Sequence, residues 1–383
     1  MHAQVVAHKM STYLSLSATF IYHVIQSVMA FSQVIVANSK ANLEVYPTTW
    51  PIISLEEELP WRSGRWIWDK LQSRLVGRPY GWTRMKPYFR NQNIRLIHCH
   101  MGPNGLWALP FKHMLGCAVV TSFYGGDFTR LIREERWQRL YGQLFEAGDM
   151  FLVEGSTMCD HLIKHGCPQD KVRLHRIGID LESLPFKPRR LDAGGKIHLL
   201  MVARFVEKKG IPYALEAVNR LKMDYPKLQL SILGDGELRP QIEQLIEDLD
   251  LKSHVKLLGY QPMQRYWAQL GQAHVLIAPS VTAADGDTEG GAPTVLLEAQ
   301  ACGLPVVSTC HADIPEVVLD GKSGLLVEER DALGLAEAIS DLIEHPETWA
   351  SMGQAGRRHV EMNHDSKLLG KRLEELYKEL IGA

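Results

Sequence analysis

The residues best suited to chemistry lie in three turns in the second half of the chain. Arg204 and Lys209 follow an apolar run, Ile197 to Val202, and precede a segment with helical periodicity. Two fixed cations at the start of a helix, where the helix dipole adds partial positive charge, suit a diphosphate ligand. A solvated basic turn explains this pair equally well when it is taken alone.

A second turn, Gly234–Asp235–Gly236, follows the next apolar run. Its two glycines allow the backbone to approach a ligand closely. Many turns between a strand and a helix carry two glycines for steric reasons alone, so this pattern is weak evidence by itself.

The third turn lies in Glu289 to Glu298, where Gly290 and Gly291 follow the first glutamate. Pro293 suits the first turn of a helix, since its missing N–H would be unpaired there, and Gly303 would end that helix. The Glu298 carboxylate can accept two hydrogen bonds from vicinal hydroxyls of a ribose or a hexose. A capped structural helix with a surface glutamate is the alternative, but acidic residues beside a glycine turn have little structural purpose.

These turns are expected to follow strands of a parallel sheet, because short apolar runs alternate with segments of helical periodicity. Ligands of such sheets bind at the carboxyl ends of the strands. In the second half the predicted helices are 212–223 and 237–251, and the predicted strands are 197–202, 228–233, 255–258, 275–278 and 305–308. In the first half the predicted strands are 4–7, 34–37, 94–98, 118–122 and 150–153.

Composition limits the class of protein. A chain of 383 residues, 45% hydrophobic and 22% charged, is typical of a globular protein with two domains. The net charge of -2 argues against a nucleic-acid partner. Six cysteines without a Cys-x-x-Cys pair indicate reduced thiols, and no signal peptide or membrane span is predicted. We therefore expect a cytoplasmic protein, which can still contact the inner face of the cell membrane.

Taken in order, the three turns resemble those of the retaining glycosyltransferases of family 4, in particular bacterial enzymes of exopolysaccharide and colanic-acid type. The resemblance is closest between about residues 155 and 345. Further matching pieces are Gly178–Asp180, Ala301–Val307, Ile314–Glu316 and Ser323–Val327.

The resemblance implies an α/β protein of the GT-B fold, with two Rossmann-like parallel-sheet domains facing a cleft. The expected acceptor-side domain covers residues 1–185 and the nucleotide-sugar domain covers 196–360. Residues 186–195, with proline, glycine and charge, have the composition of a linker. Residues 361–383 are expected to form a helix that packs back on the first domain.

The resemblance also assigns roles. Arg204 and Lys209 would neutralise the donor diphosphate, Glu289 would contact the donor sugar, and these three form the expected catalytic set. Glu298 would hold the ribose. No metal or other cofactor is expected, because the two cations stabilise the charge of the leaving diphosphate. The remaining expected donor contacts are Gly234, Gly236, Gly290, Gly291, Ala292, Pro293 and Thr294.

The sequence departs from the family pattern at two places. Eight residues separate Glu289 from Glu298, where the family usually has seven, so a second glycine lengthens the turn. Tyr124 stands where the family's Phe-His-Gly-x-Asp motif has histidine. The expected acceptor-side or cleft residues are Ser17, Thr19, His100, Tyr124, Gly125 and Asp127.

His98 and His100 share one face of a predicted strand. Buried core histidines are the default interpretation of this pair. A zinc site would need further ligands, which the sequence does not identify.

Residues 61–90 combine seven aromatic side chains with eight Lys and Arg residues against one acid, Asp69. Such a segment suits the interface of an anionic membrane that carries a lipid-linked acceptor. The alternative is a pair of helices whose tryptophans pack on the first domain.

The predicted activity is therefore transfer of a hexosyl group from a nucleotide diphosphate sugar to a saccharide or lipid-linked saccharide, with retention, in polysaccharide biosynthesis. A sugar-phosphate synthase or a nucleotide-sugar hydrolase would share the donor site. A non-catalytic nucleotide-sugar-binding scaffold is the alternative outside enzymes.

Overall fold

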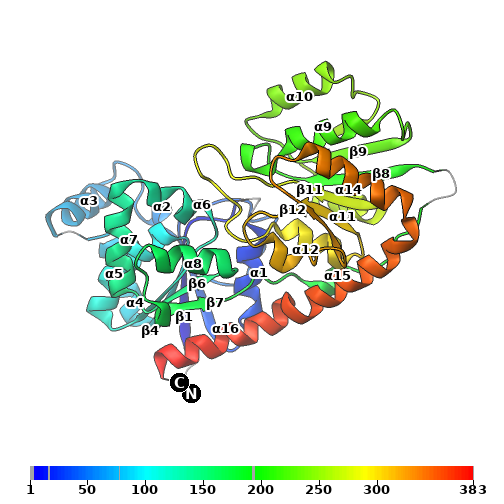
Figure 1. The fold of residues 1–383 in the computed structure, drawn as a ribbon. Helices are drawn as coiled ribbons and strands as arrows, with labels where there is room; N and C mark the ends of the chain where they lie inside the picture. The colour runs from blue at the N-terminus through cyan, green and yellow to red at the C-terminus, as the bar shows by residue number, and fades with distance from the viewer. Residues whose placement is uncertain (1–3, 16–17, 77, 192–194, 383) are drawn as a thin grey trace. The chain divides into compact units, whose positions relative to one another are not determined.

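The computed structural model describes residues 4–15, 18–76, 78–191 and 195–382. Their contacts divide the chain into two compact units, the first formed by Met1–Gly178 with Ser366–Ala383 and the second by Ile179–Asp365. Each unit contains a parallel sheet (Figure 1). The two Rossmann-like sheets agree with the predicted fold class.

The first unit has a seven-stranded sheet in the order β3-β2-β1-β4-β5-β6-β7. Its strands are β1 (Val5–Tyr13), β2 (Ser32–Lys40), β3 (Ile52–Ser54), β4 (Ile94–His100), β5 (Ala118–Ser122), β6 (Met150–Val153) and β7 (Val172–Leu174). Its helices are α1 (Thr19–Ser27), α2 (Leu55–Glu58), α3 (Gly64–Val76), α4 (Trp82–Asn91), α5 (Gly102–Leu115), α6 (Gly126–Thr129), α7 (Glu135–Ala147), α8 (Ser156–Lys164) and α16 (Ser366–Ile381).

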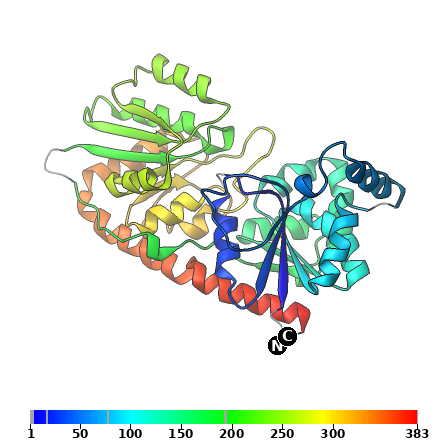
Figure 2. The ribbon, with the colours of Figure 1, turned by 180° about the vertical axis from the view of Figure 1, so that it is seen from behind.

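The two faces of this sheet are covered by different helices because side chains alternate along each strand. Ala7 and Ile97 pack with the apolar side chains of α4 and α5 on one face. Val6 and Leu96 face the other way and pack with α1 and with Leu373 of α16. The last helix is therefore part of the first unit, and Figure 2 shows it beside α1 and the first strands.

The second unit has a six-stranded sheet in the order β10-β9-β8-β11-β12-β13. Its strands are β8 (Ile197–Val202), β9 (Leu228–Leu233), β10 (Val255–Gly259), β11 (Val275–Ala278), β12 (Val306–Thr309) and β13 (Gly324–Val327). Its helices are α9 (Ile211–Leu221), α10 (Arg239–Asp248), α11 (Met263–Gln272), α12 (Thr294–Ala301), α13 (Ile314–Val317), α14 (Ala332–Glu344) and α15 (Trp349–Asn363). The apolar faces of α9 and α14 pack together over one face of the sheet.

The structure differs from the predicted domain limits. The first division follows Gly178, and the predicted linker lies within the second unit. Arg189 explains this, because its guanidinium donates to the carbonyls of Leu270, Gly271 and Cys302 and so attaches this segment to the second unit. The returning helix begins at Ser366 rather than at residue 361.

Three strands were not predicted, namely β3, β7 and β13. Strands β3 and β7 have three residues each, which is too short for a pattern of period two to stand out, and β13 is a four-residue strand that begins with a glycine. Pro293 lies directly before α12 rather than inside its first turn, with an extended backbone at ψ 130°.

Candidate functional site

The candidate site of the second unit lies where the order of its strands reverses. Strands β8 and β11 are neighbours, and the chain runs outward from them in opposite directions. Such a reversal leaves a crevice at the carboxyl ends of the two strands, where parallel sheets bind ligands. The loop after β8 carries Arg204 and Lys209, and the loop after β11 carries Glu289.

An ion pair joins these two loops. Lys209 Nζ lies 2.8 Å from both carboxylate oxygens of Glu289, and Ser280 Oγ donates to Glu289 Oε1 at 2.7 Å. Burial alone would raise the pKa of Glu289, but Lys209 and Lys208 hold it down to about 2. The structure thus brings together the two residues that the resemblance assigned to the diphosphate and the sugar.

Arg204 is different, because its side chain makes no hydrogen bond or ion pair with any residue that the structure describes. It is exposed near the start of the same loop, two residues after β8. The charge of Lys209 is balanced by Glu289, and Lys208 is held by Asp287 at 3.1 Å. Arg204 is consequently the uncompensated cation among these three residues, and it is free to meet an anionic ligand.

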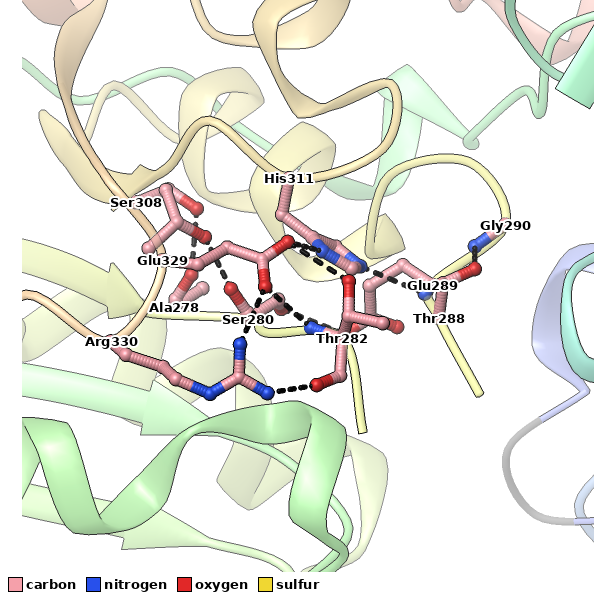
Figure 3. A network of polar contacts seen from close by, with 11 residues as sticks. Ala278, Ser280, Thr282, Thr288, Glu289, Gly290, Ser308, His311, Glu329 and Arg330 are labelled. Atoms are coloured by element: carbon pink, nitrogen blue, oxygen red, sulfur yellow. Dashed lines mark hydrogen bonds and ion pairs between the residues drawn. The ribbon is translucent and has the colours of Figure 1, made fainter. Parts of the chain in front are cut away.

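Figure 3 shows a polar network that includes Glu289, His311 and Glu329 and fixes the Glu289 loop. The Glu289 backbone N–H donates to His311 Nε2 at 3.1 Å, which places the His311 proton on Nδ1. The Nδ1–H group of His311 donates to Glu329 Oε1 at 2.6 Å. Glu329 also accepts from the backbone N–H and the hydroxyl of Thr282. The carboxylate of Glu329 therefore fixes the tautomer of His311 and the backbone of Glu289.

This network was missed at the level of the sequence. Ser280 and His311 each stand two residues beyond a strand end, after β11 and β12. Their position after a strand was a usable signal, because side chains there reach the carboxyl edge of the sheet. Glu329 follows β13, a strand that was itself not predicted.

The turn at Gly234 is required by packing. Its φ of +124° is rarely adopted by L side chains, and a Cβ would lie 1.9 Å from the carbonyl oxygen of Ala203. The glycine turn thus packs against the loop that presents Arg204. Direct contact of Gly234 and Gly236 with a nucleotide-sugar donor stays a prediction.

The extra glycine of the Glu289 turn also has a conformational explanation. Gly290 has a φ of +81°, and its N–H donates to Thr288 Oγ1 at 3.2 Å. A left-handed residue at this point lets the lengthened turn fold back while Glu289 stays on Lys209.

Glu298 lies in α12, and the hydroxyl of Tyr266 in α11 donates to its Oε2. Burial raises the pKa of Glu298 to about 7, although the Tyr266 hydrogen bond favours the ionised form. A ribose would supply two further hydroxyl donors to this carboxylate, which is the role implied by the resemblance. The sequence does not identify Tyr266, because no motif in its helix distinguishes it from an ordinary helical tyrosine.

The raised pKa of Glu298 predicts a pH-dependent effect of its replacement on stability. Because the folded-state pKa is raised above about 4.3, the value of an unfolded chain, the protonated side chain favours folding at low pH, and this contribution is lost as pH rises through about 7. Glu298→Gln should therefore raise Tm more at pH 8 than at pH 5. Thermal melts at both pH values, with the exposed Glu337→Gln as control, measure the difference. Equal shifts at both pH values would contradict the assignment.

In the first unit, the predicted residues gather around the end of β5. Asp127 accepts from the backbone N–H groups of Tyr124 and Gly102, each at 3.0 Å, so it joins the loops after β5 and β4. Burial raises the pKa of Asp127 to about 6. Gly125 is the residue that caps α6, with a φ of +131°. Asp127 thus supports these two loops.

Tyr124 and His100 are in direct contact, because the Tyr124 hydroxyl lies 2.8 Å from His100 Nδ1. Thr19 begins α1, and its hydroxyl lies 3.3 Å from that of Tyr46. Ser17 lies outside the described residues.

A third histidine, His8 of β1, joins the pair that the sequence identified. One ring nitrogen from each of His8, His98 and His100 lies within 4.8 Å of the others, and within the described ranges this is the cluster that could hold a metal ion. His98 already contacts the hydroxyls of Tyr377 at 2.5 Å and Ser122 at 2.7 Å. His8 was missed because it stands inside an apolar run, like many core residues.

Comparison with known proteins gives the following similarities. Residues 185–359 match the model of glycosyl transferases group 1, and residues 51–183 match that of glycosyltransferase family 4. The putative colanic acid biosynthesis glycosyltransferase WcaL of Escherichia coli K12 is 35% identical over 285 residues, which are 73% of this chain and 70% of that protein. The amylovoran biosynthesis glycosyltransferase AmsK of Erwinia amylovora is 36% identical over 284 residues, covering 73% and 69%.

Among solved structures, Anabaena HepE in complex with UDP aligns with a TM-score of 0.78 and 14% identity, covering 98% of this chain and 100% of that one. The sucrose-phosphate synthase of Thermosynechococcus elongatus aligns with a TM-score of 0.73 and 18% identity, covering 99% of each chain. At these identities the likeness concerns the fold.

Proposed function

Because the chain belongs to the group 1, family 4 glycosyltransferases, we propose that it moves a hexosyl group from a nucleoside diphosphate sugar to a saccharide or lipid-linked saccharide. The transfer would retain the anomeric configuration and need no resident metal. The place of the enzyme would be in the synthesis of a bacterial polysaccharide, as the names of its relatives suggest.

The observation that carries this proposal is the ion pair of Lys209 with Glu289 at the strand reversal of the second unit, with the unpaired Arg204 in the same loop as Lys209. As the glycosidic bond breaks, negative charge grows on the leaving diphosphate. Fixed cations in a partly buried site stabilise that charge without reorganising at the moment of reaction. Glu289 is held as a carboxylate and can accept hydrogen bonds from sugar hydroxyls.

A donor panel tests the proposal. Purified protein is incubated with UDP- and GDP-hexoses in chelator, and the release of nucleoside diphosphate is measured with and without a lipid-linked saccharide fraction. Acceptor-dependent release from one donor supports glycosyl transfer. Release at the same rate in water alone indicates a hydrolase, acceptance of a sugar phosphate indicates a synthase, and binding without release indicates a scaffold.

The proposal extends to a membrane surface around α3. Four large apolar side chains there are solvent-exposed, with Trp61 at 70% and Trp68 at 59% exposure, joined by Ile67 and Leu71. Helix α3 lies at the periphery of the first unit (Figures 1 and 2). Within the described residues, no helix has the length and apolarity to cross a membrane.

The charges around these side chains suit an anionic lipid surface. Arg62, Arg65 and Lys70 are exposed, while Asp69 is buried and accepts from Gly81 N and from Thr83. The acid of this segment is therefore turned inward, and the bases remain outside. Trp82, in contrast, is buried against the first unit, so the packing alternative holds for α4 and not for the exposed tryptophans.

We expect the double variant Trp61→Ala/Trp68→Ala to bind phosphatidylglycerol vesicles about tenfold more weakly than the wild type, because each tryptophan supplies apolar area at the interface. Vesicle flotation measures this. The control is Trp267→Ala, an exposed tryptophan of the second unit. Unchanged binding of the double variant, or equal binding of the wild type to phosphatidylcholine alone, would contradict membrane docking through α3.

A further inference from the structure

The loop between β11 and α12 packs against the turn Glu207–Lys209 that follows β8. A Cβ on Gly210 would lie 1.8 Å from the carbonyl oxygen of Pro279, so this loop leaves β11 in direct contact with the end of the turn. The backbone N–H of Val281 then donates to the carbonyl of Lys208 at 2.9 Å. The two segments that carry the proposed donor-site residues are therefore joined near the start of the loop.

Lys208 contacts the same loop a second time through its side chain. Its Nζ donates to the carbonyl oxygen of Thr288 at 2.7 Å and lies 3.1 Å from the Asp287 carboxylate. The Lys208 side chain is 10% exposed, and a buried ammonium group is costly unless it is paired and hydrogen-bonded. Both contacts are made to the residues directly before Glu289, so the end of this side chain is committed to the loop.

The peptide group between Thr288 and Glu289 is held at both edges. Its carbonyl accepts from Lys208 Nζ, and its N–H donates to His311 Nε2 at 3.1 Å (Figure 3). In a planar trans peptide these two groups point in opposite directions, so the pair of hydrogen bonds opposes rotation of the plane. The backbone from which the Glu289 side chain extends is fixed as a result.

This restraint matters because Glu289 precedes the lengthened turn. Glycine has more backbone freedom than any other residue, and two glycines, Gly290 and Gly291, follow Glu289 directly. Lys209 holds the carboxylate of Glu289, whereas Lys208 holds its backbone. The two neighbouring lysines thus restrain the two ends of the same residue.

We propose that Lys208 is a positioning residue for the donor sugar. Together with His311 it clamps the Thr288–Glu289 peptide, so that the Glu289 carboxylate keeps one place beside the sugar although the glycine turn is longer than usual. Lys208 acts through Glu289 and does not bind the diphosphate. The proposal rests on the proposed function for the sugar contact of Glu289, while the clamp is a property of the free protein.

Hydrogen exchange of the free protein, measured by mass spectrometry, tests the clamp without requiring turnover. The variant Lys208→Met/Asp287→Asn removes both charges of the pair, so no unpaired buried charge remains and the Tm should stay near that of the wild type. We expect amides in residues 280–293 to exchange at least about fivefold faster in this variant, with exchange in β9 unchanged.

The matched control is Lys222→Met, because Lys222 also donates to a carbonyl of the second unit, that of Leu249 at 2.6 Å. This control should leave the exchange of residues 280–293 unchanged. Wild-type exchange of that segment in the double variant would overturn the clamp, and so would a rise that β9 shares.

Kinetics separate a positioning residue from a diphosphate ligand and from a purely structural residue. In the same double variant we expect kcat for hexosyl transfer to fall about 10- to 10²-fold, as for a group displaced by about 1 Å. The Kd of UDP or GDP, which lack the sugar, should not change. A weaker Kd would show that Lys208 binds the diphosphate, and a wild-type kcat would show that the clamp serves stability alone; either result overturns the proposal. A wild-type protein that turns over no donor contradicts the proposed function, whereas the exchange result bears on the clamp, so the two failures are distinguishable.

Discussion

Replacing Arg204 by alanine is expected to lower kcat/KM about 10²-fold while leaving the Tm unchanged, a loss comparable to removal of one charge-stabilising donor from an active site. The reason is structural as well as chemical. Arg204 is exposed and makes no side-chain hydrogen bond or ion pair with the residues that the structure describes, so its removal breaks no contact. Any loss of activity then reports on a bound anion.

Two variants sharpen this test. Arg204→Lys keeps the charge and loses the planar fork, so an intermediate loss is expected. Arg220→Ala removes an exposed arginine from α9 in the same unit and should have no effect. Full activity of Arg204→Ala, measured as nucleoside diphosphate release from the donor in use, would refute a diphosphate contact at Arg204.

The second large effect is expected at Lys209. Lys209→Ala should lower kcat by about 10²- to 10³-fold, because a cation is removed where leaving-group charge develops. It should also destabilise the fold by roughly 3 kcal/mol, because the largely buried Glu289 loses its ion-pair partner. Activity and stability must therefore be separated.

The double variant Lys209→Ala/Glu289→Gln provides that separation. It removes the unpaired carboxylate and keeps the Ser280 side chain that contacts it, so much of the lost Tm should return. The reference for activity is Glu289→Gln alone, because Glu289 is itself a proposed sugar contact. If Lys209 serves the diphosphate, the double variant stays far less active than Glu289→Gln despite recovered stability. Equal activity of the two would show that Lys209 only neutralises Glu289.

Much of the fold could be predicted because its strands are continuous apolar runs. Strands β5, β6, β8, β9 and β11 begin and end at the predicted residues. The limits of the first unit could not be found in this way. They depend on Arg189, which attaches the region predicted as a linker to the second unit, and on Glu374 of α16, which accepts from the backbone of Met29 and Ala30 at 2.5 and 2.7 Å.

The site residues also fall into those that the sequence identifies and those that it does not. Arg204, Lys209 and Glu289 were found because their order along the chain is distinctive, and the structure adds that Lys209 and Glu289 are already paired. Ser280, Tyr266, His311 and His8 act through partners that are 9 to 92 residues away in sequence. The position of Ser280 and His311 directly after strands places them at the carboxyl edge of the sheet, but their partners are defined only after folding. No local pattern of residue types identifies Tyr266 or His8.

We propose above all that the second unit binds a nucleoside diphosphate through its own cations. Calorimetric titration of UDP, GDP and their monophosphates into the wild-type protein, in the presence of chelator, tests it most directly. We predict one site that binds a diphosphate at least tenfold more tightly than the matching monophosphate, a difference of about 1.4 kcal/mol. Equal affinity for the two, or binding that appears only when magnesium is added back, would contradict the claim.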